Sequence, residues 1–187
     1  MVDKTSAFSE GVLKTAFEAI NLTISRPQYI LYVITNENGI FGSHAGMVLL
    51  DLESPEESLL YDPNGSYSFK TKDGEEILSG SGYIFPNGYF SLESYIQYQK
   101  TDGDEVYAHI FYIDKIEGDK IKESIYLDRD CSMLGCAICT SEVLKSEGNI
   151  FKDLEISRRP TALGDDLRAI TQKNTNGKSI KIISLTQ

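Results

Sequence analysis

The chain has 187 residues, of which 41% are hydrophobic, and a formal net charge of -10 at pH 7. A chain of this length and composition can bury a sizeable core, and because no stretch resembles a linker, we expect one domain over residues 1–187. The acidic residues are scattered along the chain rather than gathered in a tail. That pattern is typical of a solvated surface and argues against nucleic acid or an anionic membrane as the main partner.

The amino-terminal residues, MVDKTSAFSEGVLKTAFEAI, contain no uninterrupted apolar stretch of the signal-peptide type. No segment approaches the length of a transmembrane helix. We therefore expect a protein that is made in the cytoplasm without a cleaved signal and has no membrane span. Export by a secretion machine that needs no cleaved signal is compatible with this expectation.

Hydrophobic periodicity predicts an α+β chain. An amphipathic helix is expected over residues 6–20, where apolar side chains recur at helical spacing. Three strands follow over residues 29–34, 44–50 and 59–61, which are rich in β-branched and aromatic side chains, and the last two strands form a predicted hairpin. The Asp-Pro-Asn-Gly sequence directly after them is a strong turn signal.

The second half of the chain predicts more helix. Residues 66–88 are polar and rich in glycine, so we expect a loop or short strands there. The later predicted elements are a short helix over 90–99, a strand over 106–113, a helix over 116–127, a helix that begins at Cys136 and ends at Gly148, a helix over 160–170 and a strand over 179–184.

The helix that begins at Cys136 is the first candidate functional element. One predicted face of it can be buried while Cys136 points elsewhere, and the residues of that face are Leu134, Ala137, Ile138, Ser141 and Leu144. A cysteine at the amino-terminal, positive end of a helix has its thiolate stabilised. Cys136 is therefore our candidate nucleophile.

The chain has three cysteines, at positions 131, 136 and 139. We expect no disulfide framework, because the number is odd and the side chains at positions 136 and 139 are helical neighbours that rarely have bridging geometry. Two histidines and no second pair of thiols predict no metal site, and no cofactor is expected. Asp130 could cap a longer helix that starts at Cys131, which makes Cys131 the second candidate nucleophile and leaves Cys139 third.

A candidate base and its orienting group lie on the predicted hairpin. His44 begins one strand, and Asp62 follows the next strand 18 positions later. In an antiparallel pair these positions lie close together, so Asp62 can accept a hydrogen bond from the ring of His44 and fix its tautomer. Asn64 is the alternative orienting group. His109 lies inside an apolar strand, where a histidine of the core is expected.

These residues together resemble a known family. His44-Ala45-Gly46 followed by an apolar strand and Tyr61-Asp62-Pro63-Asn64-Gly65 is similar to the histidine and aspartate half of papain-like cysteine peptidases. Gly135-Cys136, with Leu144 and Gly148 following, resembles the nucleophile helix of their NlpC-type branch. The histidine precedes the cysteine by 92 positions, as in circularly permuted members. The resemblance implies a papain-like antiparallel sheet packed against the nucleophile helix.

Among the permuted relatives, small acidic chains of this kind resemble peptidoglycan amidase toxins of the type VI secretion system. The resemblance implies a Cys136–His44–Asp62 triad, with the Cys136 amide in an oxyanion hole, that cleaves an amide bond in peptidoglycan stem peptides. It also implies action in the periplasm of a target cell and a cognate immunity protein as partner.

Two other classes of function stay open. The same thiol chemistry would serve a protease, deamidase or acyltransferase acting on a protein or a lipid. A non-catalytic α+β binding module would use the same histidine and cysteine structurally. Aromatic side chains that could wall a substrate groove are Tyr83, Phe85, Tyr89, Tyr95 and Tyr98, and ordinary packing explains them equally well. The small residues around His44, namely Ser43, Ala45 and Gly46, would leave room for a substrate chain.

Overall fold

The computed structural model describes residues 27–70, 74, 76–78, 84–127, 131, 135–147, 149–173 and 176–182. The helix expected over residues 6–20 lies outside this part of the chain, as does the end of the strand expected over 179–184.

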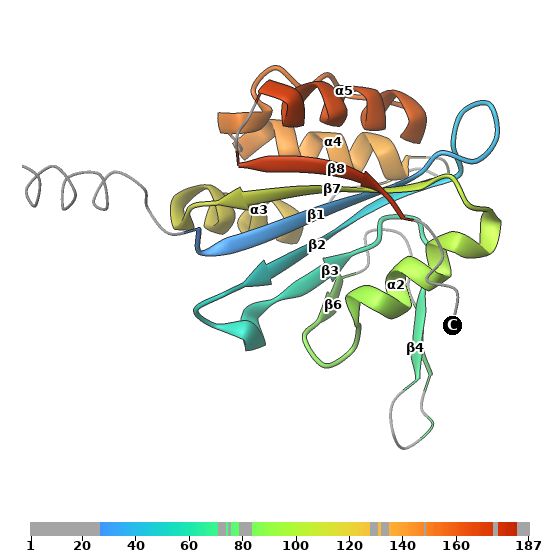
Figure 1. The fold of residues 1–187 in the computed structure, drawn as a ribbon. Helices are drawn as coiled ribbons and strands as arrows, with labels where there is room; N and C mark the ends of the chain where they lie inside the picture. The colour runs from blue at the N-terminus through green and yellow to red at the C-terminus, as the bar shows by residue number, and fades with distance from the viewer. Residues whose placement is uncertain are drawn as a thin grey trace, which may run out of the picture.

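A six-stranded antiparallel sheet forms the centre of the molecule, in the strand order β6-β3-β2-β1-β7-β8 (Figure 1). The two longest pairings join β1 to β2 and to β7, and all three strands are apolar runs of eight residues that suit the middle of a sheet. The strands are β1 (Tyr29–Asn36), β2 (His44–Asp51), β3 (Leu59–Tyr61), β6 (Ile84–Pro86), β7 (Val106–Ile113) and β8 (Gly177–Lys181). A separate two-stranded ribbon is formed by β4 (Ser68–Lys70) and β5 (Glu76–Leu78).

Four helices are present in the described residues: α2 (Leu92–Gln99), α3 (Lys115–Tyr126), α4 (Cys136–Glu147) and α5 (Pro160–Lys173). Their starts follow from local chemistry. Ser91 caps α2 in a capping box with Ser94, and the Asp114 side chain accepts a hydrogen bond from the third residue of α3. Pro160 opens α5, where its missing N–H costs nothing. The α+β class and the antiparallel sheet packed against the cysteine helix are thus confirmed.

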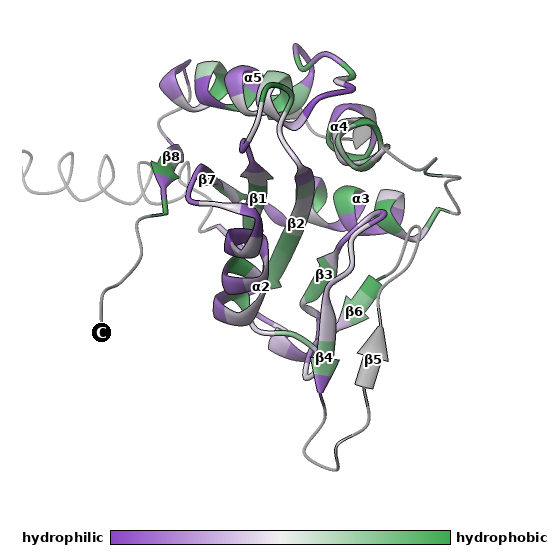
Figure 2. Cartoon of the chain, turned by 90° about the vertical axis from the view of Figure 1, so that its right-hand side faces the viewer, coloured by the Kyte–Doolittle hydropathy of each residue, from purple (hydrophilic) through white to green (hydrophobic). Residues whose placement is uncertain are grey.

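The sheet separates two cores, one on each face. Strand residues whose side chains alternate toward one face pack with α3, α4 and α5, and those that alternate toward the other face pack with α2. Figure 2 shows α2 on the opposite side of β1 and β2 from α3 and α4. In β2, for example, Met47 belongs to the core with α4, whereas Val48 belongs to the core with α2.

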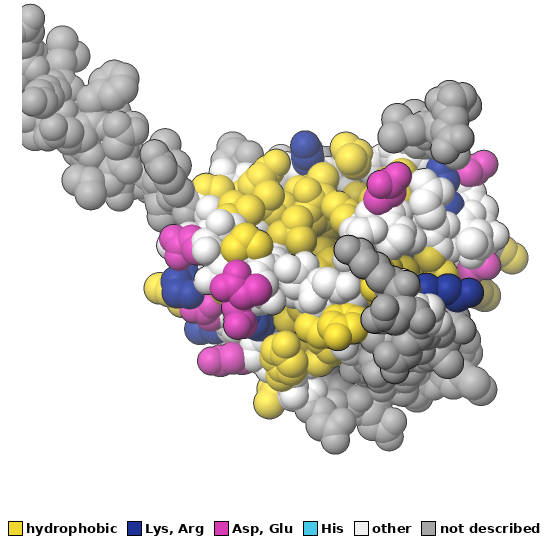
Figure 3. All heavy atoms as spheres, turned by 90° about the horizontal axis from the view of Figure 1, so that it is seen from below, with side chains coloured by type: hydrophobic (Ala, Val, Ile, Leu, Met, Phe, Trp, Pro, Cys, Tyr) yellow, Lys and Arg dark blue, Asp and Glu magenta, His cyan; other side chains and the backbone are white. Residues whose placement is uncertain are grey.

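The face that carries α2 is only partly covered. Hydrophobic side chains gather on this face in Figure 3. Ile30, Tyr32 and Leu50 pack against the α2-side core while remaining partly accessible. None of the helices in the described part of the chain combines the length and the apolar character that a membrane span requires.

Candidate active site

His44 and Asp62 meet at the end of the sheet where β2 begins and β3 ends. Their meeting follows from the strand register: Tyr61 pairs with Met47, so the next residue, Asp62, comes level with Gly46, two positions from His44. Side chains in this diagonal relation lie within reach of one another. The distance from His44 Nε2 to Asp62 Oδ1 is 2.6 Å. Since an ionised carboxylate only accepts, Nε2 carries the hydrogen and Nδ1 is the nitrogen left for another partner.

The Asp62 carboxylate is fully buried and held by a tight turn. Gly65 N–H donates to the Asp62 carbonyl at 3.1 Å, and Asn64 has a positive φ of 57° after Pro63, the arrangement of a type II turn. The carboxylate lies directly over Gly65, where a Cβ would come within 1.7 Å of Oδ2. The turn signal seen in the sequence is therefore also what aims the carboxylate at the histidine.

Cys136 is the first residue of α4, the helix that packs on the other face of the sheet, and its thiol interacts with His44. The side chain is 6% exposed and is the free cysteine of the chain, whose three cysteines are all described. Burial opposes ionisation of the thiol. Even so, the hydrogen bond and charge of His44, together with backbone N–H groups that include that of Ala137, hold the pKa of Cys136 below its usual range.

The pKa of His44 shifts in the opposite direction, upward. Burial of the ring opposes its positive charge, but the hydrogen bonds to Asp62 and to Cys136 outweigh burial and raise the pKa of His44 to about 9. The two pKa values therefore shift in the directions that favour a thiolate paired with an imidazolium. This pairing is how a cysteine nucleophile is activated by an adjacent base.

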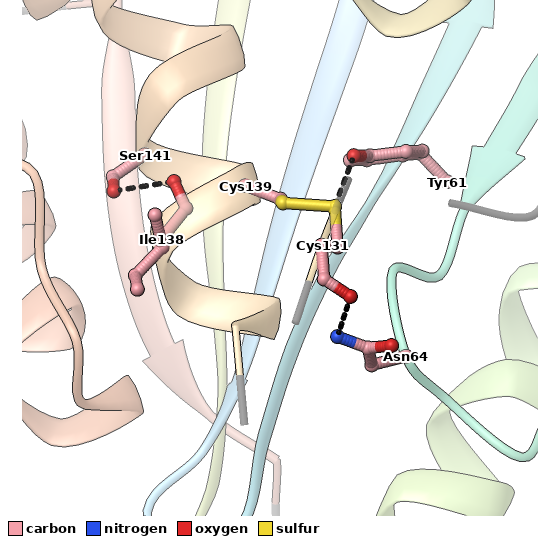
Figure 4. Close-up of a disulfide and its surroundings, with 6 residues drawn as sticks. All are labelled: Tyr61, Asn64, Cys131, Ile138, Cys139 and Ser141. Atoms are coloured by element: carbon pink, nitrogen blue, oxygen red, sulfur yellow. Dashed lines mark hydrogen bonds between the residues drawn. A yellow bond between two sulfur atoms is a disulfide. The ribbon is translucent and has the colours of Figure 1, made fainter. Parts of the chain in front are cut away.

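The cysteines correct one of our predictions. Cys131 and Cys139 form a disulfide, with sulfur atoms 2.02 Å apart (Figure 4). We expected none because the number of cysteines is odd and because the only pair we weighed was that at positions 136 and 139. Cys131 instead lies before α4, outside the helix, and its Cα atom is 6.0 Å from that of Cys139, which is within the range that a disulfide spans. Neither sulfur is then free to act as the nucleophile.

The disulfide also contacts the turn that carries Asp62. Asn64 Nδ2 donates to the Cys131 carbonyl at 2.8 Å, and the Tyr61 hydroxyl lies 3.5 Å from the Cys131 sulfur (Figure 4). The Asn64 amide thus contacts the segment before α4, and it is Asp62 that bonds to His44. Cys131 therefore links α4, through the disulfide, to the turn that carries Asp62, through its hydrogen bond from Asn64.

Sequence reasoning missed the roles of two polar residues of this site: it named Tyr95 only as a possible groove wall and did not name Gln99. Tyr95 Oη donates to Asp62 Oδ1 at 2.8 Å, and Gln99 Nε2 donates to Tyr95 Oη at 2.8 Å. Both residues come from α2, and their spacing of four was a visible sign that they share a helix face. What that face contacts could not be known, because α2 reaches Asp62 only through the fold.

His109, the other histidine of the chain, lies in β7 and not at this site. His109 is fully buried, with Nε2 3.0 Å from Thr35 Oγ1 and Nδ1 2.8 Å from Ser179 Oγ, as expected for a core histidine. Phe85 and Tyr95 are buried and cannot wall a groove, whereas Tyr98 packs edge-on against His44. Tyr83 lies outside the described residues.

Gly46 makes room for Tyr95 rather than for a substrate chain, because a Cβ at this position would lie 2.1 Å from the Tyr95 hydroxyl. The expectation that Gly46 would leave space for substrate was therefore wrong.

Within the described residues, no group of three or more histidine, cysteine, aspartate or glutamate side chains is arranged to hold a metal ion. Comparison of the chain with protein-family models, with curated proteins and with solved structures finds no match. Any assignment of function therefore depends on the chemistry of the site itself.

Proposed function

We propose that the protein is a cysteine hydrolase that cleaves an amide bond, with Cys136 as nucleophile, His44 as base and acid, and Asp62 as the group that orients His44. One arrangement carries the proposal: His44 is hydrogen-bonded to Asp62, and it lies close enough to the free thiol of Cys136, at the amino-terminal end of a helix, to hold the pKa of that thiol down. A structural histidine needs partners, but it does not need a free thiol whose pKa is lowered.

The reaction follows from these positions. The Cys136 thiolate attacks the carbonyl carbon, and the electron pair of the C=O bond moves to oxygen. The first N–H groups of a helix have no acceptor within it, so the amide of Cys136 can stabilise this oxyanion. The imidazolium of His44 then gives its proton to the leaving nitrogen as the C–N bond breaks. Water, deprotonated by His44, attacks the thioester and releases a carboxylic acid and the thiolate.

We further propose a circularly permuted papain-like fold of the NlpC type, with peptidoglycan stem peptides as substrate. The support is the arrangement of a helix-borne cysteine against an antiparallel sheet that carries histidine and aspartate, together with the sequence resemblance. The disulfide adds independent support for action outside the cytoplasm, such as in the periplasm of a target cell, because disulfides persist in oxidising compartments and are rare in reducing ones. A toxin of this kind would have a cognate immunity protein as partner.

The test is incubation of the purified, oxidised protein with peptidoglycan, followed by chromatography and mass measurement of the released fragments. The variants Cys136→Ala and His44→Gln remove the nucleophile and the base, and Ser179→Ala, at the buried His109 cluster, serves as a control that changes a distant polar group. Fragment release by the wild type and the control alone would support the proposal, and the new chain ends would identify the bond.

If no fragments are released, the reactivity of the Cys136 thiol distinguishes two explanations. If the thiol still reacts rapidly with iodoacetamide in a manner that depends on His44, the substrate is wrong and a protein or lipid target must be sought. If Cys136 reacts no faster than an ordinary thiol and His44→Gln changes nothing, the catalytic pair is wrong and a binding module is the better description.

A further inference from the structure

The hydroxyl of Tyr95 donates a hydrogen bond to the carboxylate of Asp62, the proposed orienting group. Tyr95 lies on α2, on the sheet face opposite to α4, and is fully buried. Its hydroxyl donates to Asp62 Oδ1 at 2.8 Å, the same oxygen that accepts from His44 Nε2 at 2.6 Å. Within the described residues, the other oxygen, Oδ2, accepts a longer bond, of 3.3 Å, from the backbone N–H of Tyr67. Tyr95 therefore provides one of the two short contacts to the carboxylate.

The direction of the hydroxyl hydrogen follows from its two neighbours. Gln99 Nε2 lies 2.8 Å from Tyr95 Oη, and an amide nitrogen can only donate. An ionised carboxylate can only accept, so the hydroxyl hydrogen must point to Asp62. Burial, with the charge of Asp62, raises the pKa of Tyr95 well above its usual value, so the phenol keeps this hydrogen at any working pH.

We propose that Tyr95 and Gln99 are positioning residues that act on His44 through Asp62. This inference rests on the proposed function, since it concerns the same reaction. The phenol fixes the carboxylate in the orientation that holds the His44 ring, with Nδ1 turned toward Cys136. Gln99 fixes the phenol.

The surroundings show that this chain of bonds is built into the fold. Gly46 is level with Asp62 in the sheet, and a Cβ there would collide with the Tyr95 hydroxyl at 2.1 Å. The backbone carbonyl of Gln99 accepts from Asn36 Nδ2 at 2.6 Å, and Asn36 is the strand partner of His44. The contacts thus run from His44 in β2 to Asp62 after β3, then to Tyr95 and Gln99 in α2. From there they reach Asn36 in β1, which pairs with His44.

The experiment compares Tyr95→Phe with Tyr29→Phe. Tyr29 is a matched control: its ring is also buried and its hydroxyl also donates to a carboxylate, that of Asp119 at 2.6 Å, but at the far end of β1. The readout is the rate of Cys136 alkylation by iodoacetamide as a function of pH, which needs no substrate. Thermal unfolding of both variants reports on folding.

We expect Tyr95→Phe to slow alkylation near neutral pH by about tenfold, since a hydrogen bond to a charged group is lost, and to move the onset of alkylation to higher pH. Tyr29→Phe should leave both unchanged while costing comparable stability. A wild-type profile for Tyr95→Phe would overturn the inference. A shift of the onset to lower pH would overturn it too, because the phenol would then only withdraw charge from Asp62.

Gln99→Met keeps the inference testable should Tyr95→Phe fail to fold. Methionine has a similar volume but cannot donate, so the phenol loses the bond that directs its hydrogen. We expect a smaller shift in the same direction, and an unchanged profile would contradict the role of Gln99. These failures are distinct from failure of the proposed function, in which the wild-type thiol itself would react slowly and independently of His44.

Discussion

The Cys131–Cys139 disulfide makes a prediction for both stability and reactivity. The two residues are 8 positions apart. In the chain-entropy model, closing a loop of this size removes disorder from the unfolded chain and stabilises the fold by about 2.5 kcal/mol. For a chain of this length, that free energy corresponds to a fall in melting temperature of roughly 5–10 °C when the bond is absent.

The assay is thermal and denaturant unfolding of the wild type with and without dithiothreitol, beside the double variant in which Cys131 and Cys139 are both alanine. Reduction should lower the melting temperature of the wild type to that of the double variant. It should not affect the double variant itself, which retains only Cys136. Mass measurement after alkylation, without reduction, should find one reactive thiol in each protein.

The disulfide should also affect the reactivity of Cys136, the proposed nucleophile. Because Cys131 contacts Asn64 through its carbonyl, losing the bond to Cys139 frees α4 from the turn that carries Asp62. Alkylation of Cys136 should then lose part of its dependence on His44. Equal melting temperatures and equal alkylation profiles in oxidised and reduced protein would refute this reasoning.

Three further predictions concern the charge of Asp62, the space over Gly65 and the buried ring of His109. Asp62→Asn should lower the pKa of the histidine it contacts from about 9 and slow alkylation of Cys136 at neutral pH by about tenfold, whereas Asp165→Asn, the same charge change on the surface, should not. Gly65→Ala should displace the carboxylate, with alkylation as slow as in Asp62→Asn and an unfolding free energy lower by about 1–3 kcal/mol. His109 is held neutral by burial, which lowers its pKa to about 3. The unfolded chain therefore binds its proton first as pH falls below 6.5, so stability should drop by about 2 kcal/mol by about pH 5, and His109→Gln should remove this slope in urea titrations.

Much of the described fold could be predicted from local pattern. The strand over residues 106–113 and the hairpin of β2 and β3 are defined by apolar runs and a strong turn, and these signals act over a few residues. The region over 66–88 could not be resolved further, because its short strands depend on pairing with partners rather than on their own sequence.

The same distinction, between features set by local sequence and features set by distant contacts, holds for the candidate site. His44 and Asp62 could be paired from the sequence because adjacent strands fix their separation. The partner of Cys131 and the target of Tyr95 could not, since both depend on how a helix or loop docks over the sheet. The missed disulfide is instructive: an odd number of cysteines excludes a complete pairing of all of them, but it does not exclude one pair.

The separation of the two cores has a consequence for how Cys136 would lose its reactivity. Cys136 is aligned by the packing on one side of the sheet, and the carboxylate behind His44 is aligned by the packing on the other. A cavity made in either core, even far from the site, would shift one layer relative to the other. Heating loosens the packing of both cores. The reactivity of the Cys136 thiol should therefore decline before the global unfolding transition, so the rate of alkylation reports on how well the two layers are aligned.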